Sequence, residues 1–298
     1  MEKLSKNKLI VILGPTSSGK TGLSIKLAKK YNGEIVSADS RQVYKGMDIG
    51  SGKVTKKEMA GIPHWMLDVA NPKKRFTVAQ YQKLALKAIK NIQKRGKLPI
   101  LVGGTGFYIQ SIVDGIVIPK VKPDWALRKK LELKPLPDLV KELTRIDPAR
   151  AANIDQNNQR RVIRALEIVL KTKRPVSTLG QKPSNFYILQ LGIKKSPEEL
   201  KKNIAKRLLK RIKGDAMLNE VKKLHKILSW KRLEEFGLEY RFVAQYLQNK
   251  ITNDEMTNKI QIESEHYTKR QMTWFKRDKN INWITNYKEV NNLLKNFL

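Results

Sequence analysis

The chain has 298 residues, which is enough for a hydrophobic core and one or two domains. It has no cysteine and only three histidines, far apart in the sequence, which excludes disulfides, thiolate metal sites and a histidine cluster with metal-ligand spacing. With 61 Lys and Arg against 27 Asp and Glu, the formal net charge is +34. This charge favours a polyanionic partner such as nucleic acid, although a lysine-rich proteome would produce the same excess.

No stretch of the chain approaches the length of a membrane-spanning helix. Residues 1–8 are polar, and the apolar run that follows them is too short for a signal peptide. The absence of cysteine fits a reducing compartment. We therefore expect a cytoplasmic, monomeric protein without a membrane partner.

The first predicted element is a buried strand over residues 9–13, where five apolar residues stand in a row. It leads into Gly14-x-x-x-x-Gly19-Lys20-Thr21, the spacing of a phosphate-binding loop (P-loop), and then into a helix over residues 22–30. Glycine lets several N–H groups point at one anion, lysine adds a positive charge, and threonine offers a hydroxyl group to Mg²⁺. The alternative is a glycine-rich turn that arose by chance. We expect a phosphorylated compound at Gly14, Pro15, Thr16, Ser17, Ser18, Gly19, Lys20 and Thr21.

A second strand is predicted over residues 35–38, and Asp39 lies at its C-terminal end. In parallel sheets with helices between the strands, this end carries the chemistry, so we expect Asp39 and Lys20 at the same edge. The alternative is that Asp39 only caps a local turn.

The next segments continue an alternation of strands and helices. Residues 45–75 are rich in glycine and proline and are predicted to be loops, residues 77–94 have the apolar spacing of a helix, and residues 98–102 form an apolar strand. This order predicts an α/β fold with a parallel sheet. A P-loop ATPase or GTPase usually carries an Mg²⁺-binding Asp after such a strand, whereas here Gly-Gly-Thr follows. This difference argues against nucleotide hydrolysis and leaves Asp39 free to act as a base.

Proline residues break the following part of the chain into short helices, which predicts an inserted helical subdomain. Its best-defined helix covers residues 158–171, where Arg160 and Arg164 share one face. This pair could bind nucleic-acid phosphates or simply be solvated, and the sequence leaves both interpretations open. The predicted organisation is a core domain of residues 1–118 and 185–298 and an insertion of residues 119–184.

The chain returns to the sheet with an apolar strand over residues 186–193, and Ser196 begins a basic helix. The remaining part is predicted to be helical and basic. Its densest cluster, residues 267–277, interleaves cations with aromatic rings, which suits base stacking and phosphate binding. The alternative for Trp274 and Phe275 is a place in the core.

Several segments together resemble the tRNA dimethylallyltransferase (tRNA isopentenyltransferase) family. They follow the order of the family and span nearly the whole chain, which makes the ordered set specific even though each segment alone could arise by chance. The segments are Gly14–Thr21, Ser37–Tyr44, Met47–Lys53, Ile62–Asp68, Val102–Tyr108, Arg160–Glu167 and Lys269–Phe275.

This resemblance implies a P-loop NTPase-like parallel sheet core flanked by helices, with a small inserted helical subdomain that contacts tRNA. It implies a prenyltransferase that moves the dimethylallyl group of dimethylallyl diphosphate to N6 of the adenosine at tRNA position 37, 3′ of the anticodon, and releases diphosphate. The P-loop would bind this donor with Mg²⁺ rather than ATP, and the anticodon stem-loop of tRNA would be the partner. The missing Asp after Val102 agrees with this, because no γ-phosphate has to be cleaved.

The resemblance also implies roles for single residues. Asp39 matches the proposed general base, Thr105 matches a residue close to the reacting centre, and Arg207 matches an arginine that binds diphosphate. Thr16–Thr21 match the diphosphate and Mg²⁺ site, with Thr21 as the metal ligand. The positions that match tRNA contacts are Asp39, Ser40, Arg41, Gln42, Thr105, Arg128, Arg160, Arg161, Val162, Ile163 and Arg164.

Two segments depart from the family pattern. The family usually has His-Pro-Asn-Asp where this chain has Asp155-Gln156-Asn157-Asn158, and Phe236-Gly237-Leu238-Glu239-Tyr240 replaces a Gly-Tyr-Lys-Glu-like segment. These departures, and the short insertion, concern the tRNA contacts and leave Lys20, Asp39 and Thr105 untouched.

Three other functions stay open from the residues alone. A P-loop kinase of a small metabolite would share the N-terminal motif, bind ATP and need no RNA. An RNA-binding protein with a vestigial P-loop would have no need for the intact Lys20 and Thr21. A relative that prenylates free adenine nucleotides would need far fewer cations than this chain carries.

Overall fold

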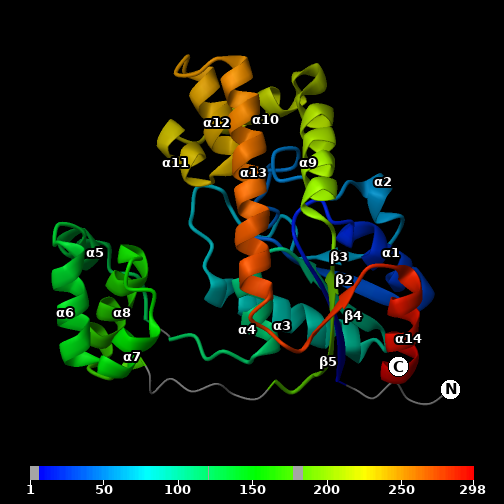
Figure 1. Cartoon of the computed structure of the whole chain (residues 1–298), viewed down its shortest axis with the longest axis horizontal. Coiled ribbons are helices and arrows are strands. Elements are labelled where there is room, and N and C mark those ends of the chain that lie inside the picture. The colour runs from blue at the N-terminus through cyan, green and yellow to red at the C-terminus, as the bar shows by residue number, and fades with distance from the viewer. Residues whose placement is uncertain (1–6, 120, 177–183) are drawn as a thin grey trace. The chain divides into compact units, whose positions relative to one another are not determined.

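The computed structural model describes residues 7–119, 121–176 and 184–298. It divides the chain into two compact units, Met1–Val113 with Ser184–Leu298, and Asp114–Pro183. The first unit carries a parallel sheet, whereas the described part of the second unit is helical (Figure 1). The predicted insertion, residues 119–184, overlaps the second unit over nearly its whole length.

The sheet of the first unit has six strands in the order β3-β2-β4-β1-β5-β6, and every pair of neighbours is parallel. This confirms the predicted α/β fold with a P-loop-type parallel sheet. Four of the strands were predicted from their apolar runs. The strands are β1 (Lys8–Leu13), β2 (Gly33–Ala38), β3 (His64–Trp65), β4 (Leu98–Gly103), β5 (Tyr187–Ile193) and β6 (Ile281–Ile284).

The register of the strands brings their carboxyl ends into one row. Leu13 of β1 pairs with Gly103 of β4 and with Gly192 of β5, and Ala38 of β2 also pairs with Gly103. The P-loop after β1, Asp39 after β2 and the loop after β4 therefore start at the same edge of the sheet. This edge is where parallel α/β sheets bind their ligands.

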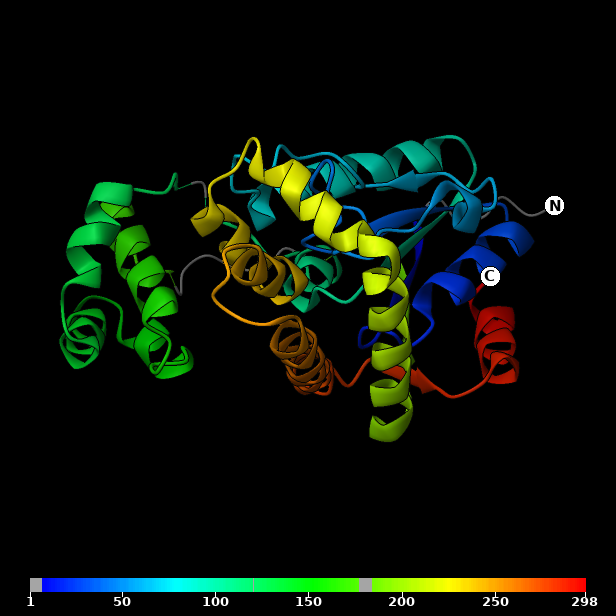
Figure 2. The same ribbon diagram turned by 90° about the horizontal axis from the view of Figure 1, so that it is seen from above.

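Side chains of β1 alternate between two hydrophobic clusters, because successive residues of a strand point to opposite faces. Leu9 and Val11 pack with α3 (Val78–Lys94), whereas Ile10 and Ile12 pack with α1 (Lys20–Lys30) and α14 (Tyr287–Phe297). Figure 2 shows the teal α3 and the red α14 on opposite sides of the strands. The core of the first unit is therefore a three-layer sandwich with the sheet in the middle.

Several helices of the first unit begin at a side-chain cap. Thr77 forms a capping box with Gln80 before α3, and Ser196 accepts the N–H of Glu199 at the start of the ninth helix. The remaining helices of the first unit are α2 (Lys56–Met59), α4 (Gly106–Val113), α9 (Pro197–Ile212), α10 (Ala216–His225), α11 (Trp230–Glu235), α12 (Leu238–Leu247) and α13 (Asn253–Phe275). A short 3₁₀ turn, η2 (Lys213–Asp215), joins α9 to α10.

Two strands and two helices were not predicted, and one of these helices is α4. The segment over residues 45–75 is mainly loop as expected, but it contains α2 and the two-residue strand β3. The C-terminal part is not purely helical, because β6 adds a sixth strand after α13. Both strands are short edge strands, so neither has the apolar run that identifies a central strand.

A buried ion pair lies at the other end of the strands, where their amino ends are. Glu34, near the start of β2, has a side chain that is 1% exposed and accepts hydrogen bonds from Arg95, from Trp65 and from Lys97. The Arg95 hydrogen bond is the largest of the effects that lower the pKa of Glu34 to about 2, against the opposing effect of burial. This ion pair lies at the amino ends of the strands, away from the ligand-binding edge.

The second unit contains α5 (Trp125–Glu132), α6 (Leu136–Ile146), α7 (Pro148–Asn153) and α8 (Gln159–Thr172). Leu139, Leu143, Val162 and Leu166 are fully buried at its centre. The helix predicted over residues 158–171 corresponds to α8, with Asn158 as its N-cap. Of the helices in the described part of the chain, none has the length and apolar character needed to cross a membrane.

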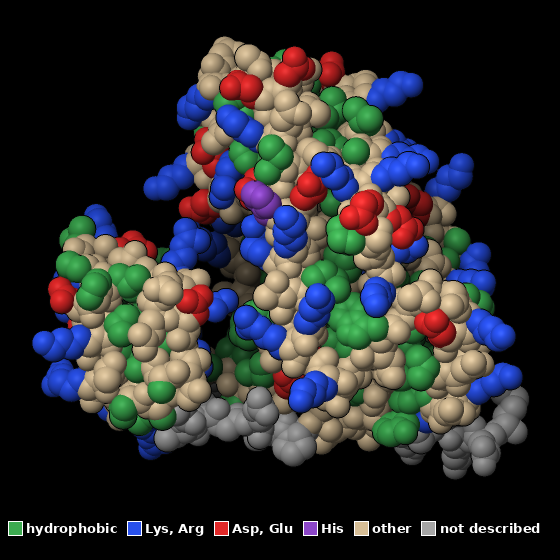
Figure 3. Space-filling model, viewed as in Figure 1, with side chains coloured by type: hydrophobic (Ala, Val, Ile, Leu, Met, Phe, Trp, Pro, Cys, Tyr) green, Lys and Arg blue, Asp and Glu red, His purple; other side chains and the backbone are tan. Residues whose placement is uncertain are grey.

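Positive charge is spread over the surface. In Figure 3, Lys and Arg side chains dominate the visible face of both units, and Asp and Glu side chains are fewer. The excess of Lys and Arg in the composition is therefore displayed at the surface of this face rather than neutralised there by acidic neighbours.

Candidate active site

The P-loop turns sharply between β1 and α1. Gly14 has φ +145° and Gly19 has φ +96°, a region of the backbone that residues with a side chain rarely adopt. A Cβ on Gly14 would also lie 3.1 Å from the carbonyl oxygen of Ile193 in β5. The glycine spacing recognised in the sequence is thus required by the backbone, and the chance-turn alternative is not needed.

Lys20 is the first residue of α1, and its ammonium group folds back over the loop. Its Nζ donates to the carbonyl oxygens of Gly14 (3.0 Å) and Pro15 (2.6 Å). Burial of this group, together with the nearby Arg207, lowers the pKa of Lys20 to about 7, and Asp39 opposes this shift. Part of the side chain is exposed, but the ammonium itself is enclosed by the loop.

Asp39 follows β2 and is held by its own turn. Its Oδ1 accepts the backbone N–H groups of Arg41 (2.8 Å) and Gln42 (3.2 Å). Among the described residues, no donor binds its other carboxylate oxygen, Oδ2. One carboxylate oxygen therefore caps the turn, as the turn-capping alternative predicted, and the functional role of Asp39 stays a prediction.

Thr105, in the loop after β4, is attached to the same turn. Its Oγ1 accepts the N–H of Ser40 (3.0 Å), and its own N–H donates to the carbonyl of Ala38 (3.1 Å). Tyr267 of α13 lies next to both residues. Burial, with a contribution from Asp39, raises the pKa of Tyr267 to about 12, and a hydrogen bond with Thr105 opposes the shift.

Arg207 projects from α9 toward the P-loop. Its Nη1 donates to Thr16 Oγ1 (3.1 Å) and its Nη2 donates to the carbonyl of Gly52 (3.2 Å). Burial, and then the neighbouring Arg211, lower the pKa of Arg207 to about 10. The structure thus places Arg207 beside Lys20 and Thr16, although more than 180 residues separate it from them in the chain.

Gln271 of α13 ties two loops of the site together. Its Oε1 accepts the N–H of Thr16 in the P-loop (2.9 Å), and its Nε2 donates to the carbonyl of Gly104 (2.8 Å). The cluster over residues 267–277 therefore contributes a residue that holds two loops of the site together. Phe275 is buried in the core and Trp274 packs against it, as the core alternative for these two rings predicted.

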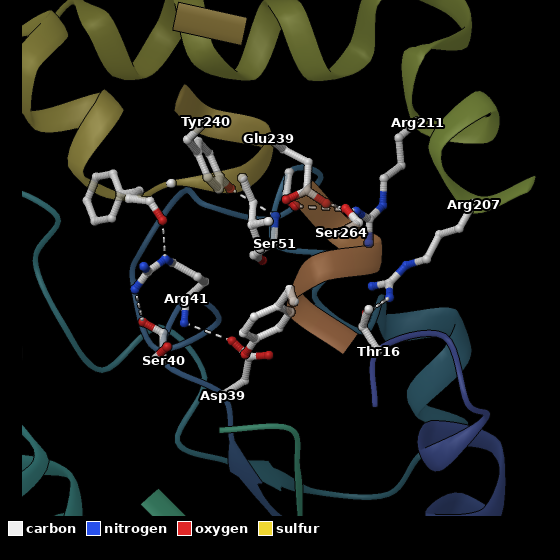
Figure 4. Close-up of a pocket in the computed structure, with 15 residues that line it drawn as sticks. Thr16, Asp39, Ser40, Arg41, Ser51, Arg207, Arg211, Glu239, Tyr240 and Ser264 are labelled. Atoms are coloured by element: carbon white, nitrogen blue, oxygen red, sulfur yellow. Dashed lines mark hydrogen bonds and ion pairs between the residues drawn. The ribbon is translucent and has the colours of Figure 1, made fainter. Parts of the chain in front are cut away.

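Two cavities share Asp39, and Figure 4 shows the residues that line the smaller one. The larger, about 570 Å³, is lined by the P-loop, Gln271 and the carboxyl ends of β2 and β4. The smaller, about 110 Å³, is lined by Ser40, Arg41 and Ser264 and by the segment over residues 236–240. Residues that line both are Thr16, Asp39, Ser51, Arg207, Arg211 and Tyr267.

Sequence reasoning gave no role to several residues of this site. Arg211, Tyr240 and Glu239 line the smaller cavity, and Tyr267 and Gln271 come from α13. Tyr267 and Gln271 lie inside the cluster noted in the sequence, which was a usable signal. Glu239 and Tyr240 belong to a segment that departs from the family pattern, so no motif pointed to them.

The predicted tRNA contacts of the second unit divide into two groups. Arg160 and Arg161 are exposed at the start of α8. Arg128 and Arg164 instead bind Glu167, whose side chain is 0% exposed. Val162 and Ile163 are 0% and 3% exposed, so the expectation that their side chains contact tRNA is corrected: they face the core because they lie on the apolar stripe of α8.

The donors at the site suit a hard divalent cation. The Thr21 hydroxyl and the Asp39 carboxylate both line the larger cavity, and Mg²⁺ commonly uses one or two protein oxygens together with substrate phosphates. In the described part of the chain no group of three or more His, Cys, Asp or Glu residues is placed to hold a metal by itself. A metal here would therefore be bound mainly through a phosphorylated ligand.

Comparisons with known proteins agree with this geometry. A family model described as IPP transferase matches residues 42–278. A tRNA dimethylallyltransferase of Syntrophomonas wolfei is 39% identical over 299 residues, covering 97% of this chain and 96% of the relative. The corresponding protein of Carboxydothermus hydrogenoformans is 41% identical over 290 residues, covering 95% and 93%.

Two solved structures are also similar. The full-length tRNA isopentenylpyrophosphate transferase of Bacillus halodurans is 35% identical with a TM-score of 0.70, covering 98% of this chain and 94% of that one. A eukaryotic dimethylallyltransferase acting on tRNA is 28% identical with a TM-score of 0.79, covering 97% and 77%. The chain therefore belongs to the tRNA dimethylallyltransferase (IPP transferase) family.

Proposed function

We propose that this protein transfers the dimethylallyl group of dimethylallyl diphosphate to N6 of adenosine 37 in tRNA. The observation that carries the proposal is the position of Asp39 at the junction of two cavities. The larger cavity, lined by the P-loop, suits the diphosphate of the donor. The smaller, partly apolar cavity on the other side of Asp39 leads toward the acceptor base.

The reaction needs a base beside the attacking amine. The exocyclic N6 forms a bond to the terminal methylene carbon of the dimethylallyl group, the bond from this carbon to the diphosphate oxygen breaks, and its electron pair leaves with diphosphate. The proton of N6 is taken up by Asp39, whose Oδ1 is fixed by two backbone N–H groups while Oδ2 accepts no hydrogen bond from the described residues. A base that is positioned in this way contributes about 10²–10⁴-fold to the rate.

The departing diphosphate gains negative charge as the bond breaks. Lys20, Arg207 and the N–H groups of the P-loop are placed to stabilise that charge, and they are fixed before the reaction occurs. Mg²⁺ bound at Thr21 and the diphosphate would supply additional charge neutralisation. Thr105 orients the turn that carries Asp39 through its hydrogen bond from Ser40.

The acceptor has to reach Asp39 from the tRNA side. Adenosine 37 must leave the stack of the anticodon loop, since a base inside a stack does not reach an enclosed pocket. Ser40, Arg41 and Gln42 form the turn beside the smaller cavity, and they are the proposed contacts to this nucleotide. Arg160 and Arg161 of the second unit are proposed to bind phosphates of the anticodon stem-loop.

The product of the reaction distinguishes this proposal from its alternatives. The protein is incubated with labelled dimethylallyl diphosphate, Mg²⁺ and unmodified tRNA, and the tRNA is digested and analysed for prenylated adenosine. Parallel incubations contain AMP in place of tRNA, or labelled ATP in place of the prenyl donor. We expect label at one adenosine, 3′ of the anticodon. Label in free AMP with none in tRNA would identify a nucleotide prenyltransferase, and phosphate transfer from ATP would identify a kinase; either result contradicts the proposal. We further propose that the protein acts as a monomer in the cytoplasm.

A further inference from the structure

Two arginines of α9 converge on one point of the larger cavity. Arg207 and Arg211 are one helical turn apart and both line the larger cavity. In Figure 4 the side chain of Arg207 points toward Thr16 and that of Arg211 points toward Glu239. A Cβ added to Gly52, which has φ +61°, would lie 1.7 Å from Arg207 Nη2 and 1.8 Å from Arg211 Nη2. The two Nη2 atoms therefore lie close to the same point beside Gly52, where the positive φ favours glycine.

The two guanidinium groups differ in how their donors are used. Both terminal nitrogens of Arg207 donate, to Thr16 and to Gly52. In Arg211, Nη1 donates to Glu239 Oε1 (2.7 Å) and to the carbonyl of Gly50 (3.3 Å). Its Nη2 is buried and has no hydrogen-bond partner among the described residues.

A buried donor of a charged group is costly when nothing accepts from it. The same cavity is lined by two further buried atoms without a partner in the described chain, the hydroxyl oxygens of Ser17 and Ser18 in the P-loop. Three of the unsatisfied polar atoms are thus gathered around one cavity. This arrangement is typical of a binding site in which the bound ligand provides the hydrogen-bond partners of these atoms.

The charges point to an anion. Arg207 and Arg211 repel each other, and among the described residues the one carboxylate that forms an ion pair with either of them is Glu239, which binds Arg211. The side chains of Arg211 and Glu239 are 12% and 15% exposed, so water screens this repulsion poorly. A multiply charged anion between the arginines and the P-loop would satisfy the free donor and neutralise the excess charge.

We propose that Arg211 is a second guanidinium that binds the diphosphate of the donor, alongside Arg207. This inference rests on the proposed function, since it assigns one more residue to the same diphosphate. Arg211 donates through Nη2 to a diphosphate oxygen, while Glu239 keeps the guanidinium in place through Nη1. The competing interpretation is that Arg211 and Glu239 form only a structural ion pair between α9 and α12.

The two interpretations predict different results when the partners are changed one at a time. Binding of inorganic diphosphate with Mg²⁺, without tRNA, is measured by calorimetry for the wild type, Arg211→Gln and Glu239→Gln. We expect Arg211→Gln to weaken binding by about 10–100-fold, the range for a hydrogen bond to a charged group. Glu239→Gln still accepts from Nη1 and removes a negative charge near the anion, so its affinity should equal or exceed that of the wild type.

A control variant and a conservative variant distinguish a loss of diphosphate binding from a loss of stability. Arg95→Gln breaks the buried pair with Glu34 at the opposite edge of the sheet, so it should lower thermal stability without changing diphosphate affinity. Arg211→Lys keeps the positive charge and should recover part of the affinity. If Glu239→Gln weakens binding as much as Arg211→Gln, or if Arg211→Gln binds like the wild type, the proposal is wrong.

Steady-state kinetics separates this inference from the proposed function. Arg211→Gln should raise KM for dimethylallyl diphosphate and leave KM for tRNA unchanged; a rise confined to the KM for tRNA would overturn the assignment. If the wild-type protein fails to bind diphosphate and binds ATP instead, the proposed function itself fails, and the inference fails with it. Intact binding and prenyl transfer by the wild type, with an unaltered Arg211→Gln variant, would refute the inference alone.

Discussion

The two units of this protein each contain a pair of arginines that lie close together, and they use them in opposite ways. In the second unit, Arg128 and Arg164 both bind the fully buried carboxylate of Glu167. In the first unit, Arg207 and Arg211 line a cavity, and of the two only Arg211 forms an ion pair with a described residue, Glu239. In the first pair both guanidinium groups bind a carboxylate of the protein, whereas in the second pair Arg207 forms no ion pair with a described residue and Arg211 keeps a buried donor without a partner.

The comparison teaches how to tell a structural arginine from a binding one. Burial by itself raises the pKa of Glu167, but the hydrogen bonds from Arg128, from the N–H of Asp124 and from Arg164 outweigh it, so the pKa is lowered. The carboxylate is therefore charged at neutral pH and satisfies both arginines. Sequence alone gave Arg128 and Arg164 the same weight as Arg207, because each matched a family position.

The largest expected effect is on the turnover rate, from a change in the cavity of the first unit. Asp39→Asn keeps an Oδ1 that can accept from Arg41 and Gln42, so the turn should be preserved, but the amide does not take up a proton. We expect turnover to fall by about 10²–10⁴-fold, with tRNA affinity and thermal stability close to those of the wild type. Single-turnover assays with labelled donor measure the rate. A variant that prenylates at the wild-type rate would show that Asp39 is not the base.

The second effect should appear in stability rather than in chemistry. Glu167→Gln leaves Arg128 and Arg164 without their shared charge in the interior of the second unit. Removing one partner of a buried pair typically costs about 3–5 kcal/mol. Urea unfolding followed by circular dichroism should show this decrease, while the affinity for inorganic diphosphate stays unchanged. A fall in diphosphate affinity would mean that the two units do not divide their arginines as proposed.

The affinity for diphosphate should depend on pH, because one cation of the site has a pKa close to neutral pH. Because the pKa of Lys20 is lowered to about 7, the ammonium form predominates below this pH and the neutral amine above it. Diphosphate binds the ammonium form better, so affinity should fall as pH rises through 7, by up to about tenfold per pH unit for one proton. Calorimetry across pH 6–9 measures it. Lys20→Arg stays charged throughout and should show a flatter profile, and identical profiles would contradict the assignment to Lys20.

The smallest effect is expected from the exposed arginines of the second unit. Replacing Arg160 and Arg161 by alanine should weaken tRNA binding several-fold and flatten its salt dependence, by about 0.7–0.9 in the log–log slope for each phosphate that is no longer bound. Arg164→Gln is the matched comparison on the same helix and should change the slope less, because Arg164 binds Glu167 and the carbonyl of Val121. A larger change from Arg164→Gln would reverse this division of the arginines into two groups.

Much of the fold was determined by local sequence. The apolar runs of β1, β2, β4 and β5 identified the central strands, Ser196 identified the start of α9, and the spacing of apolar residues identified α3 and α8. These features depend on neighbours within a few residues, so spacing reveals them. The same holds for the P-loop, whose glycines fix a local backbone path, and for Asp39, which directly follows a strand.

Only the tertiary structure determined which residues from distant parts of the chain meet at the P-loop and Asp39. Arg207, Arg211, Tyr267 and Gln271 reach the P-loop and Asp39 from helices that lie far away along the chain. Whether a given arginine serves a ligand or a buried glutamate likewise depends on the side chain it meets, and no periodicity records that partner. The composition shows that the chain has more cations than anions. Charges and hydrogen bonds act between groups that are close in space, so only the fold determines which cations lack an acidic partner.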